Sequence, residues 1–144
     1  MLIQNFELEK RLDDWTLDAE TLADMFDVKA VSAGDGTIVN TGPHSIQLGD
    51  GLFRAEFYYR KGKMTHIKLM PKIDGVKDPG YPSKKYEAAK CEYCTAILKQ
   101  LYGNKYIPTP IGIQYETTNY IIGCYVKRKG KNKYGGGNII ISMR

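Results

Sequence analysis

The sequence lacks the long apolar runs and the leader segments that mark membrane and exported proteins. No apolar run approaches the roughly 20 residues that a membrane-spanning helix needs. The N-terminus has neither the basic start nor the apolar middle of a secretory signal peptide. If Met1 is the natural start, we expect a cytoplasmic protein with no membrane span. A chain trimmed of an export signal would begin in the same way, and this alternative stays open.

Cysteine and histidine are scarce, with three and two residues respectively. Cys91 and Cys94 have the spacing of a redox pair, but both fall roughly two turns into a predicted helix, away from the N-terminal end where the dipole lowers a thiol pKa. The other candidate ligands are Cys124, His44 and His66, and neither histidine belongs to a ligand pair. We therefore expect structural cysteines, no metal and no cofactor, with a zinc or redox role as the alternative.

The motifs of common hydrolases and nucleotide-binding enzymes are also missing. The chain contains no Gly-x-Ser-x-Gly, no His-Glu-x-x-His and no glycine-rich loop that opens a helix. The glycines at 135–137 precede a predicted strand, so they offer no helix N-terminus to a phosphate. An enzyme is the weakest of three hypotheses. It would require a closed pocket that holds His66 or Cys91 beside a second titratable group.

Acidic residues are absent from the C-terminal part of the chain, although the net charge is only +5. No acid follows Glu116, whereas residues 1–27 hold eight acids and two bases. The charge is therefore polarised along the sequence. Mutual neutralisation of the acidic N-terminal part and the basic C-terminal part explains this pattern as well as a binding function does.

A short basic motif occurs twice, as residues 60–63 (Arg-Lys-Gly-Lys) and 128–131. One constant shift places residues 45–48 on 112–115, and the alternating residues of 53–59 on 120–126. We interpret this agreement as an internal duplication, since order, spacing and strand face agree together. The alternative is that two unrelated hairpins share a common turn composition.

The duplication divides a chain that we expect to form one domain, residues 1–144. Its parts are pseudo-repeat 1 at about residues 16–72, a loop at 73–82, and pseudo-repeat 2 at about 83–144. Hydrophobic periodicity predicts an α+β fold in which each half is a helix followed by antiparallel strands. Helices that cover one face of the sheet would make a two-layer domain, and the opposite face would be open.

The expected helices differ in strength. The stronger begins after Ser83 and ends at Tyr102, where Gly103 stops it. The shorter begins near Thr16, its expected cap. Strands are predicted at residues 52–60, from the turn at 61–62 to residue 69, and at 113–115, 120–127 and 138–143, with an extra strand within 31–43. Pro108 and Pro110 are expected to isolate the strand that follows them.

This tandem unit of helix, Leu-x-x-x-aromatic helix ending and antiparallel strands resembles the β-lactamase-inhibitor-protein and outer-membrane-assembly-lipoprotein E type of fold. Residues 22–26 and 98–103, with the strands after each, carry the resemblance, which spans about residues 17–143. It implies two helical units behind a curved sheet whose exposed face grips a protein partner. The chain has no export signal, no lipidation cysteine near its start and no disulfide pattern within a unit, so only the fold carries over.

The leading functional hypothesis is a non-catalytic protein that binds a protein partner, for example as an inhibitor or immunity factor. The chain has 11 tyrosines, which suit half-exposed sheet faces, and one isoleucine is predicted to point outward. The candidates on the open sheet face are Tyr58, His66, Lys68, Ile121 and Tyr125. Nothing in the sequence indicates an oligomeric state.

Basic residues at the two predicted hairpin tips support the alternative of a nucleic-acid-binding module. The first tip has Arg60, Lys61 and Lys63. The second has Lys127, Arg128, Lys129, Lys131 and Lys133. Cations beside aromatic residues suit phosphate contact and base stacking, and two such tips would bracket the open face. Lysines at a hairpin tip also keep it soluble and prevent edge pairing, which is the interpretation we favour.

Overall fold

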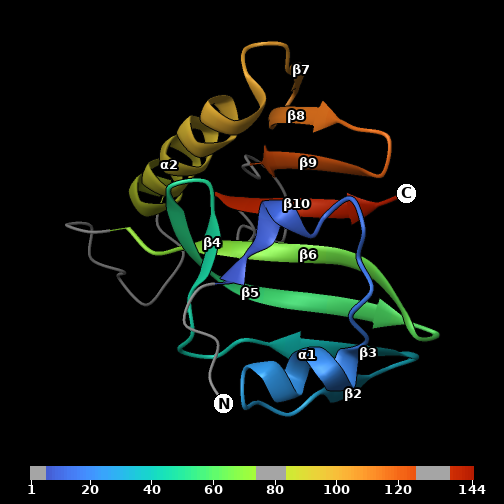
Figure 1. Cartoon of the computed structure of the whole chain (residues 1–144). Helices are drawn as coiled ribbons and strands as arrows, with labels where there is room; N and C mark the ends of the chain where they lie inside the picture. Colours follow the sequence, from blue (N-terminus) through green and yellow to red (C-terminus); the bar gives the residue numbers. More distant parts are fainter. Residues whose placement is uncertain (1–5, 74–83, 126–136) are drawn as a thin grey trace.

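Strands dominate the residues that the structure, a computed structural model, describes: 6–73, 84–125 and 137–144. Within them, ten strands form one sheet, accompanied by two α-helices and a short 3-10 helix (Figure 1). The predicted α+β class is confirmed. No helix in this part of the chain is long and apolar enough to cross a membrane.

The strands range from two residues in β1 to ten in β5. Before the first gap they are β1 (Phe6–Glu7), η1 (Leu8–Lys10), α1 (Ala19–Met25), β2 (Val31–Ala33), β3 (Gly36–Asn40), β4 (Ile46–Leu48), β5 (Gly51–Arg60) and β6 (Lys63–Pro71). After it they are α2 (Lys84–Tyr102), β7 (Ile107–Thr109), β8 (Gly112–Glu116), β9 (Tyr120–Tyr125) and β10 (Asn138–Met143). The extra strand expected within 31–43 is thus present as β2 and β3.

The strand order is β1-β4-β5-β6-β10-β9-β8-β7, and β3 also pairs with β5 and carries β2. Every pair is antiparallel except β1 with β4. The last strand, β10, lies between β6 and β9, so the two parts of the chain share one sheet.

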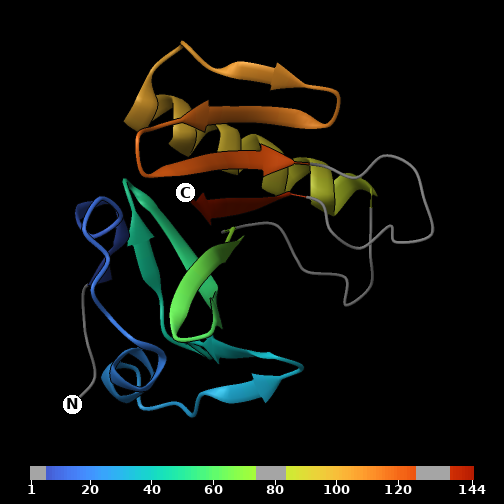
Figure 2. The ribbon, with the colours of Figure 1, turned by 90° about the vertical axis from the view of Figure 1, so that its right-hand side faces the viewer.

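Alternation along the strands builds the core on one face of the sheet. In β5 every second residue is buried, namely Phe53, Ala55, Phe57 and Tyr59. The same face continues through Ile67, Leu69, Ile122, Cys124, Ile139 and Ile141. Both helices add buried residues to this core cluster: Leu22, Ala23, Cys94, Ile97 and Leu98. Helices therefore cover this face, and Figure 2 shows α2 behind β9 and β10. We call the opposite face of the sheet the outer face.

The first basic motif forms the turn of the β5–β6 hairpin, as predicted. Lys61 and Gly62 have φ of +52° and +78°, the two positive values of a type I′ turn, whose twist matches that of the flanking strands. Further along β6, the expected alternation is wrong at Thr65. Tyr58 pairs with His66 but Tyr59 pairs with Met64, so Thr65 is the extra residue of a bulge and Met64 packs against the core in its place.

The prolines after α2 do not exclude strand structure. Pro108 lies within β7, which the sequence did not predict, and pairs with Ile113 of β8. Because β7 is the last strand at this edge of the sheet, a residue without an N–H is tolerated there. The predicted end of α2 at Tyr102 is confirmed, and Gly103 follows it with φ +87°.

The cap of α1 is Asp18 and not Thr16. The helix begins at Ala19, and a carboxylate oxygen of Asp18 accepts the backbone N–H of Thr21 at 2.8 Å. This backbone hydrogen bond, helped by a side-chain bond from Thr21, lowers the pKa of Asp18 below its usual 3.8. The sequence pattern predicted the start of the helix within three residues but indicated the wrong cap. Threonine and aspartate can both accept hydrogen bonds from the first backbone N–H groups of a helix, so residue type alone does not separate them.

Removing the Asp18 cap is expected to destabilise the protein in a pH-dependent way. A carboxyl whose pKa is lowered by folding stabilises fully above the unfolded value of 3.8, and loses this contribution as the pH falls through the lower folded value. The melting temperature of wild type should therefore exceed that of Asp18→Ala at neutral pH, and the gap should shrink below pH 3.8. Asp18→Asn, which caps without titrating, is the matched control. A wild-type advantage independent of pH would contradict this assignment.

Candidate binding face

The five residues predicted on the open side of the sheet all lie on the outer face. Tyr58 of β5 is directly opposite His66 of β6, which is opposite Ser142 of β10. Ser142 in turn is opposite Ile121 of β9. Four adjacent strands therefore bring three of the candidates into one continuous row across the centre of the sheet.

A second row runs beside the first, two residues further along each strand. Lys68 of β6 lies between Glu56 of β5 and Ile140 of β10. Ile140 is opposite Gly123 of β9, which is opposite Gln114 of β8. Tyr125 follows Gly123 by two residues on β9, so it lies on the same face. The candidates thus form one surface, not two separate patches.

Tyr58 and His66 form a flat aromatic pair on the β5–β6 side of this surface. Their rings stack with centroids 4.1 Å apart and planes 12° apart. The Thr65 hydroxyl donates to the backbone carbonyl of Tyr58 at 3.2 Å and lies 3.0 Å from Nδ1 of His66. Because that hydroxyl has one proton, both contacts are hydrogen bonds only in the tautomer that carries its proton on Nδ1. Partial burial lowers the pKa of His66, so the ring is neutral at neutral pH.

Glu56 connects the two rows. Its carboxylate accepts the Tyr58 hydroxyl at 3.2 Å and the Asn40 amide at 3.4 Å, and lies 4.0 Å from the Lys68 ammonium. Burial, followed by the charge of Glu56, raises the pKa of Tyr58, so its hydroxyl keeps its proton. The lysine and the glutamate compensate each other, and the surface at this point is polar without a net charge.

The Tyr125 side chain lies over Gly123, two residues earlier on β9. Its hydroxyl donates to Oε1 of Gln114 on β8 at 3.1 Å. A Cβ added at Gly123 would overlap the end of the Tyr125 ring and come within 2.8 Å of the Ile113 carbonyl. Gly123 therefore provides the space in which the tyrosine ring lies flat, and the ring fills the gap that the glycine leaves on the outer face.

Sequence reasoning missed the contribution of β10 to this face. Ile140 and Ser142 separate the candidates of β6 from those of β9, yet nothing in the local pattern places the last strand between them. One signal was available: of the three consecutive isoleucines at 139–141, the middle one must point away from the other two. It is half-buried on the outer face, where it is opposite Lys68.

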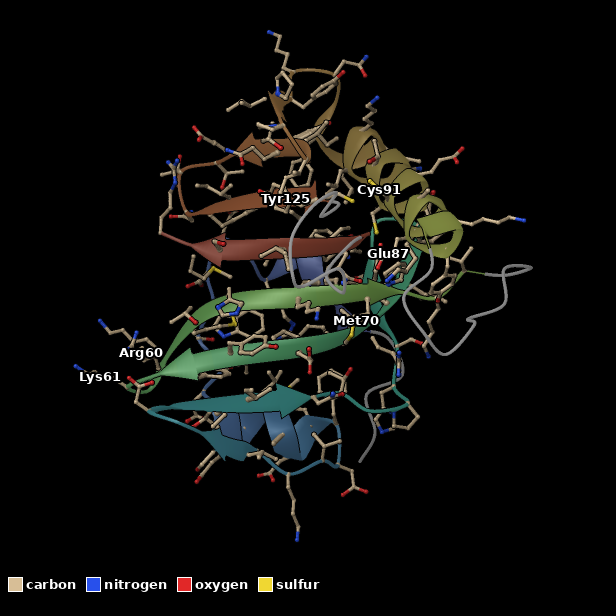
Figure 3. All side chains as sticks on the ribbon, turned by 180° about the vertical axis from the view of Figure 1, so that it is seen from behind. Arg60, Lys61, Met70, Glu87, Cys91 and Tyr125 are labelled. Carbon is tan, nitrogen blue, oxygen red and sulfur yellow. The ribbon has the colours of Figure 1, made fainter. Side chains whose placement is uncertain are left out.

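Only the first of the two basic tips lies within the described residues. Arg60, Lys61 and Lys63 lie at the β5–β6 turn, and Arg60 is paired with Asp35 at 2.5 Å. Lys127, Arg128, Lys129, Lys131 and Lys133 lie outside the described residues. The strand ends on either side of that segment, Tyr125 and Asn138, pair with each other at the far end of β10 from the turn. Figure 3 shows Arg60 and Lys61 projecting from one end of the sheet, with Tyr125 away from them.

A hollow of about 420 Å³ lies beside the β5–β6 turn. It is lined by residues 12–13, 15–18, 62–64, 119 and 143–144. Its charged residues are two acids, Asp13 and Asp18, and two bases, Lys63 and Arg144. Neither His66 nor Cys91 lines it, so it is not the pocket that the enzyme hypothesis requires. Its balanced charges suit no particular ligand.

No protein-family model, no curated protein and no solved structure matches this chain.

Proposed function

We propose that this protein binds a protein partner through the outer face and performs no catalysis there. The observation that carries the proposal is the single surface formed by Tyr58, His66, Lys68, Ile121 and Tyr125, all chosen from the sequence. Both α-helices pack on the other side of the sheet, so neither covers this surface. Tyrosines around an apolar centre are typical of interface hot spots, and an inhibitor or immunity protein would use such a face.

The charges of the surface support a protein partner more than a nucleic acid. A phosphate-binding site needs cations that are available to neutralise phosphates. Three cations at this face or its rim already have acidic partners: Lys68 with Glu56, Arg60 with Asp35, and Arg144 with Glu116 at 3.6 Å. The aromatic and apolar residues between them need no such neutralisation.

The strand order supports the two-unit arrangement that is part of the proposal. From the centre outward, β6, β5 and β4 follow one another on one side, and β10, β9 and β8 on the other. One helix precedes each set along the chain. A duplicated unit of helix and three strands would produce this order, with β6 and β10 meeting at the pseudo-twofold axis, and the outer face would then be shared by both units.

Capture from native lysate with matched variants tests the proposal. Ile121→Lys places a charge in the centre of the outer face, and Ala96→Lys adds the same charge on the exposed side of α2. We expect proteins that wild type and Ala96→Lys retain equally and that Ile121→Lys loses. For a purified partner, Kd should rise by about 30-fold, the loss of one hot spot.

Two outcomes would contradict the proposal. One is that both lysine variants retain the same proteins as wild type. The other is that wild type retains RNA or DNA, released by moderate salt and lost in Lys61→Glu with Lys63→Glu, because phosphate contacts release counterions. The second outcome would support the nucleic-acid alternative in its place. Circular dichroism of each variant establishes that it is folded.

A further inference from the structure

Three thiols gather between α2 and β9. Cys91 and Cys94 lie about one turn apart on α2, and Cys124 lies on the core side of β9. The sulfur atoms of Cys91 and Cys124 are 3.5 Å apart, although 33 residues separate them in sequence. The sulfur of Cys94 donates to the carbonyl of Gly137 at 3.4 Å. All three are present as thiols and not as disulfides.

The three thiols differ in their access to solvent. Cys94 and Cys124 are fully buried, whereas Cys91 is half-buried. Contact with the Cys91 thiol lowers the pKa of Cys124, but contact with Cys94 and burial outweigh it and raise this pKa to about 12. A small oxidant would therefore reach Cys91 first, and Cys124 would react second. Figure 3 shows the Cys91 side chain on α2, one helical turn after Glu87.

We propose that Cys91 and Cys124 are an oxidation site at which a small peroxide produces a reversible disulfide between α2 and β9. In the first step, the Cys91 sulfur attacks one oxygen of hydrogen peroxide. The O–O bond breaks, Cys91 becomes a sulfenic acid, and the other oxygen leaves as water. In the second step, the Cys124 sulfur attacks the Cys91 sulfur, the S–O bond breaks, and the hydroxide leaves as water with the Cys124 proton. Two thiols lose two electrons in total, and one peroxide becomes two waters.

The geometry favours this pair over the other combinations. A disulfide needs a sulfur separation of about 2.05 Å, so rotation of the half-buried Cys91 side chain would have to bring the two sulfur atoms together from 3.5 Å. Cys94 is held by the Gly137 carbonyl. Within the described ranges, no group of three or more histidine, cysteine or acidic residues is placed to hold a metal ion.

Peptide mapping of the full chain tests the proposal. The protein is treated with hydrogen peroxide, remaining thiols are blocked with N-ethylmaleimide, and the unreduced digest is analysed by mass spectrometry. We expect one cross-linked peptide pair that joins Cys91 to Cys124, has lost two hydrogen atoms and is separated again by dithiothreitol. Cys94→Ser should give the same pair in the same yield. Cys91→Ser and Cys124→Ala should both lose it.

Three results would overturn the proposal: a bond from Cys94 to either neighbour, a bond between two chains, or oxidation of Cys91 to sulfinic acid with no cross-link. Because Cys124 is buried, its variant could fail to fold. Cys91→Ser changes only the half-buried partner, so its loss of the cross-link in a folded chain decides the question without Cys124→Ala. A thermal unfolding curve of each variant accompanies the mapping.

Discussion

Replacing Phe57 by alanine is expected to lower the free energy of unfolding by about 3–5 kcal/mol, the usual cost of emptying a buried phenylalanine site. Phe57 is fully buried and connects the N-terminal segment to the sheet. Its ring stacks on Trp15 with centroids 5.5 Å apart and meets Phe6 edge-on at 6.5 Å. Loss of the ring would therefore leave a cavity and also loosen the segment that packs over β5.

The neighbouring residue is the matched control for this prediction. Tyr58 follows Phe57 on β5 but points to the outer face, where it is half-buried. We expect Tyr58→Ala to cost about 1 kcal/mol or less, the range of surface changes that create no cavity. Urea unfolding of the two variants measures both values. Equal losses would show that the two faces of β5 are not assigned as described.

Gly123→Ala is expected to cost about 2–3 kcal/mol, as overpacking of a filled position does. The added methyl group would overlap the ring of Tyr125 and crowd the Ile113 carbonyl. The ring would have to leave its place across β9, and its hydrogen bond to Gln114 would break. The change would therefore alter the stability of the protein and the shape of the outer face together.

A double-mutant cycle with Tyr125→Ala separates the two contacts. If displacement of the ring causes most of the loss, Gly123→Ala should cost roughly 1 kcal/mol less when the ring is already absent, since residues in contact are not additive. The remaining cost comes from the backbone carbonyl, which cannot move away as a side chain can. Equal costs in both backgrounds would mean that Tyr125 does not lie over Gly123.

Local patterns predicted the elements whose two faces differ most clearly. The alternation in β5 separates Phe53, Ala55, Phe57 and Tyr59 from their neighbours, and it identified both the core face and the outer face correctly. Gly103 marked the end of α2 because its position there requires positive φ. In both cases the decisive information lies within a few residues of the sequence.

Contacts between distant segments could not be predicted in the same way. The position of β10 between β6 and β9 depends on its pairing with β6 across about half the chain, and no local pattern specifies it. The Thr65 bulge is another example, because an extra residue in β6 can be recognised only when its pairing with β5 is known. The approach of Cys91 to Cys124 likewise depends on how α2 packs on the sheet. For this reason the face of the sheet on which each candidate lies could be predicted, but the arrangement of the candidates into rows could not.

Covalent footprinting with diethyl pyrocarbonate, in the presence and absence of the captured partner, tests the binding role of the outer face most directly. The reagent modifies histidine, lysine and tyrosine, so it reports on His66, Lys68 and Tyr58 at once. If this face binds the partner, labelling of these three residues should fall in the complex, while labelling of exposed Lys99 on α2 stays unchanged. Protection of Lys99 with undiminished labelling of the three outer-face residues would contradict the proposed function.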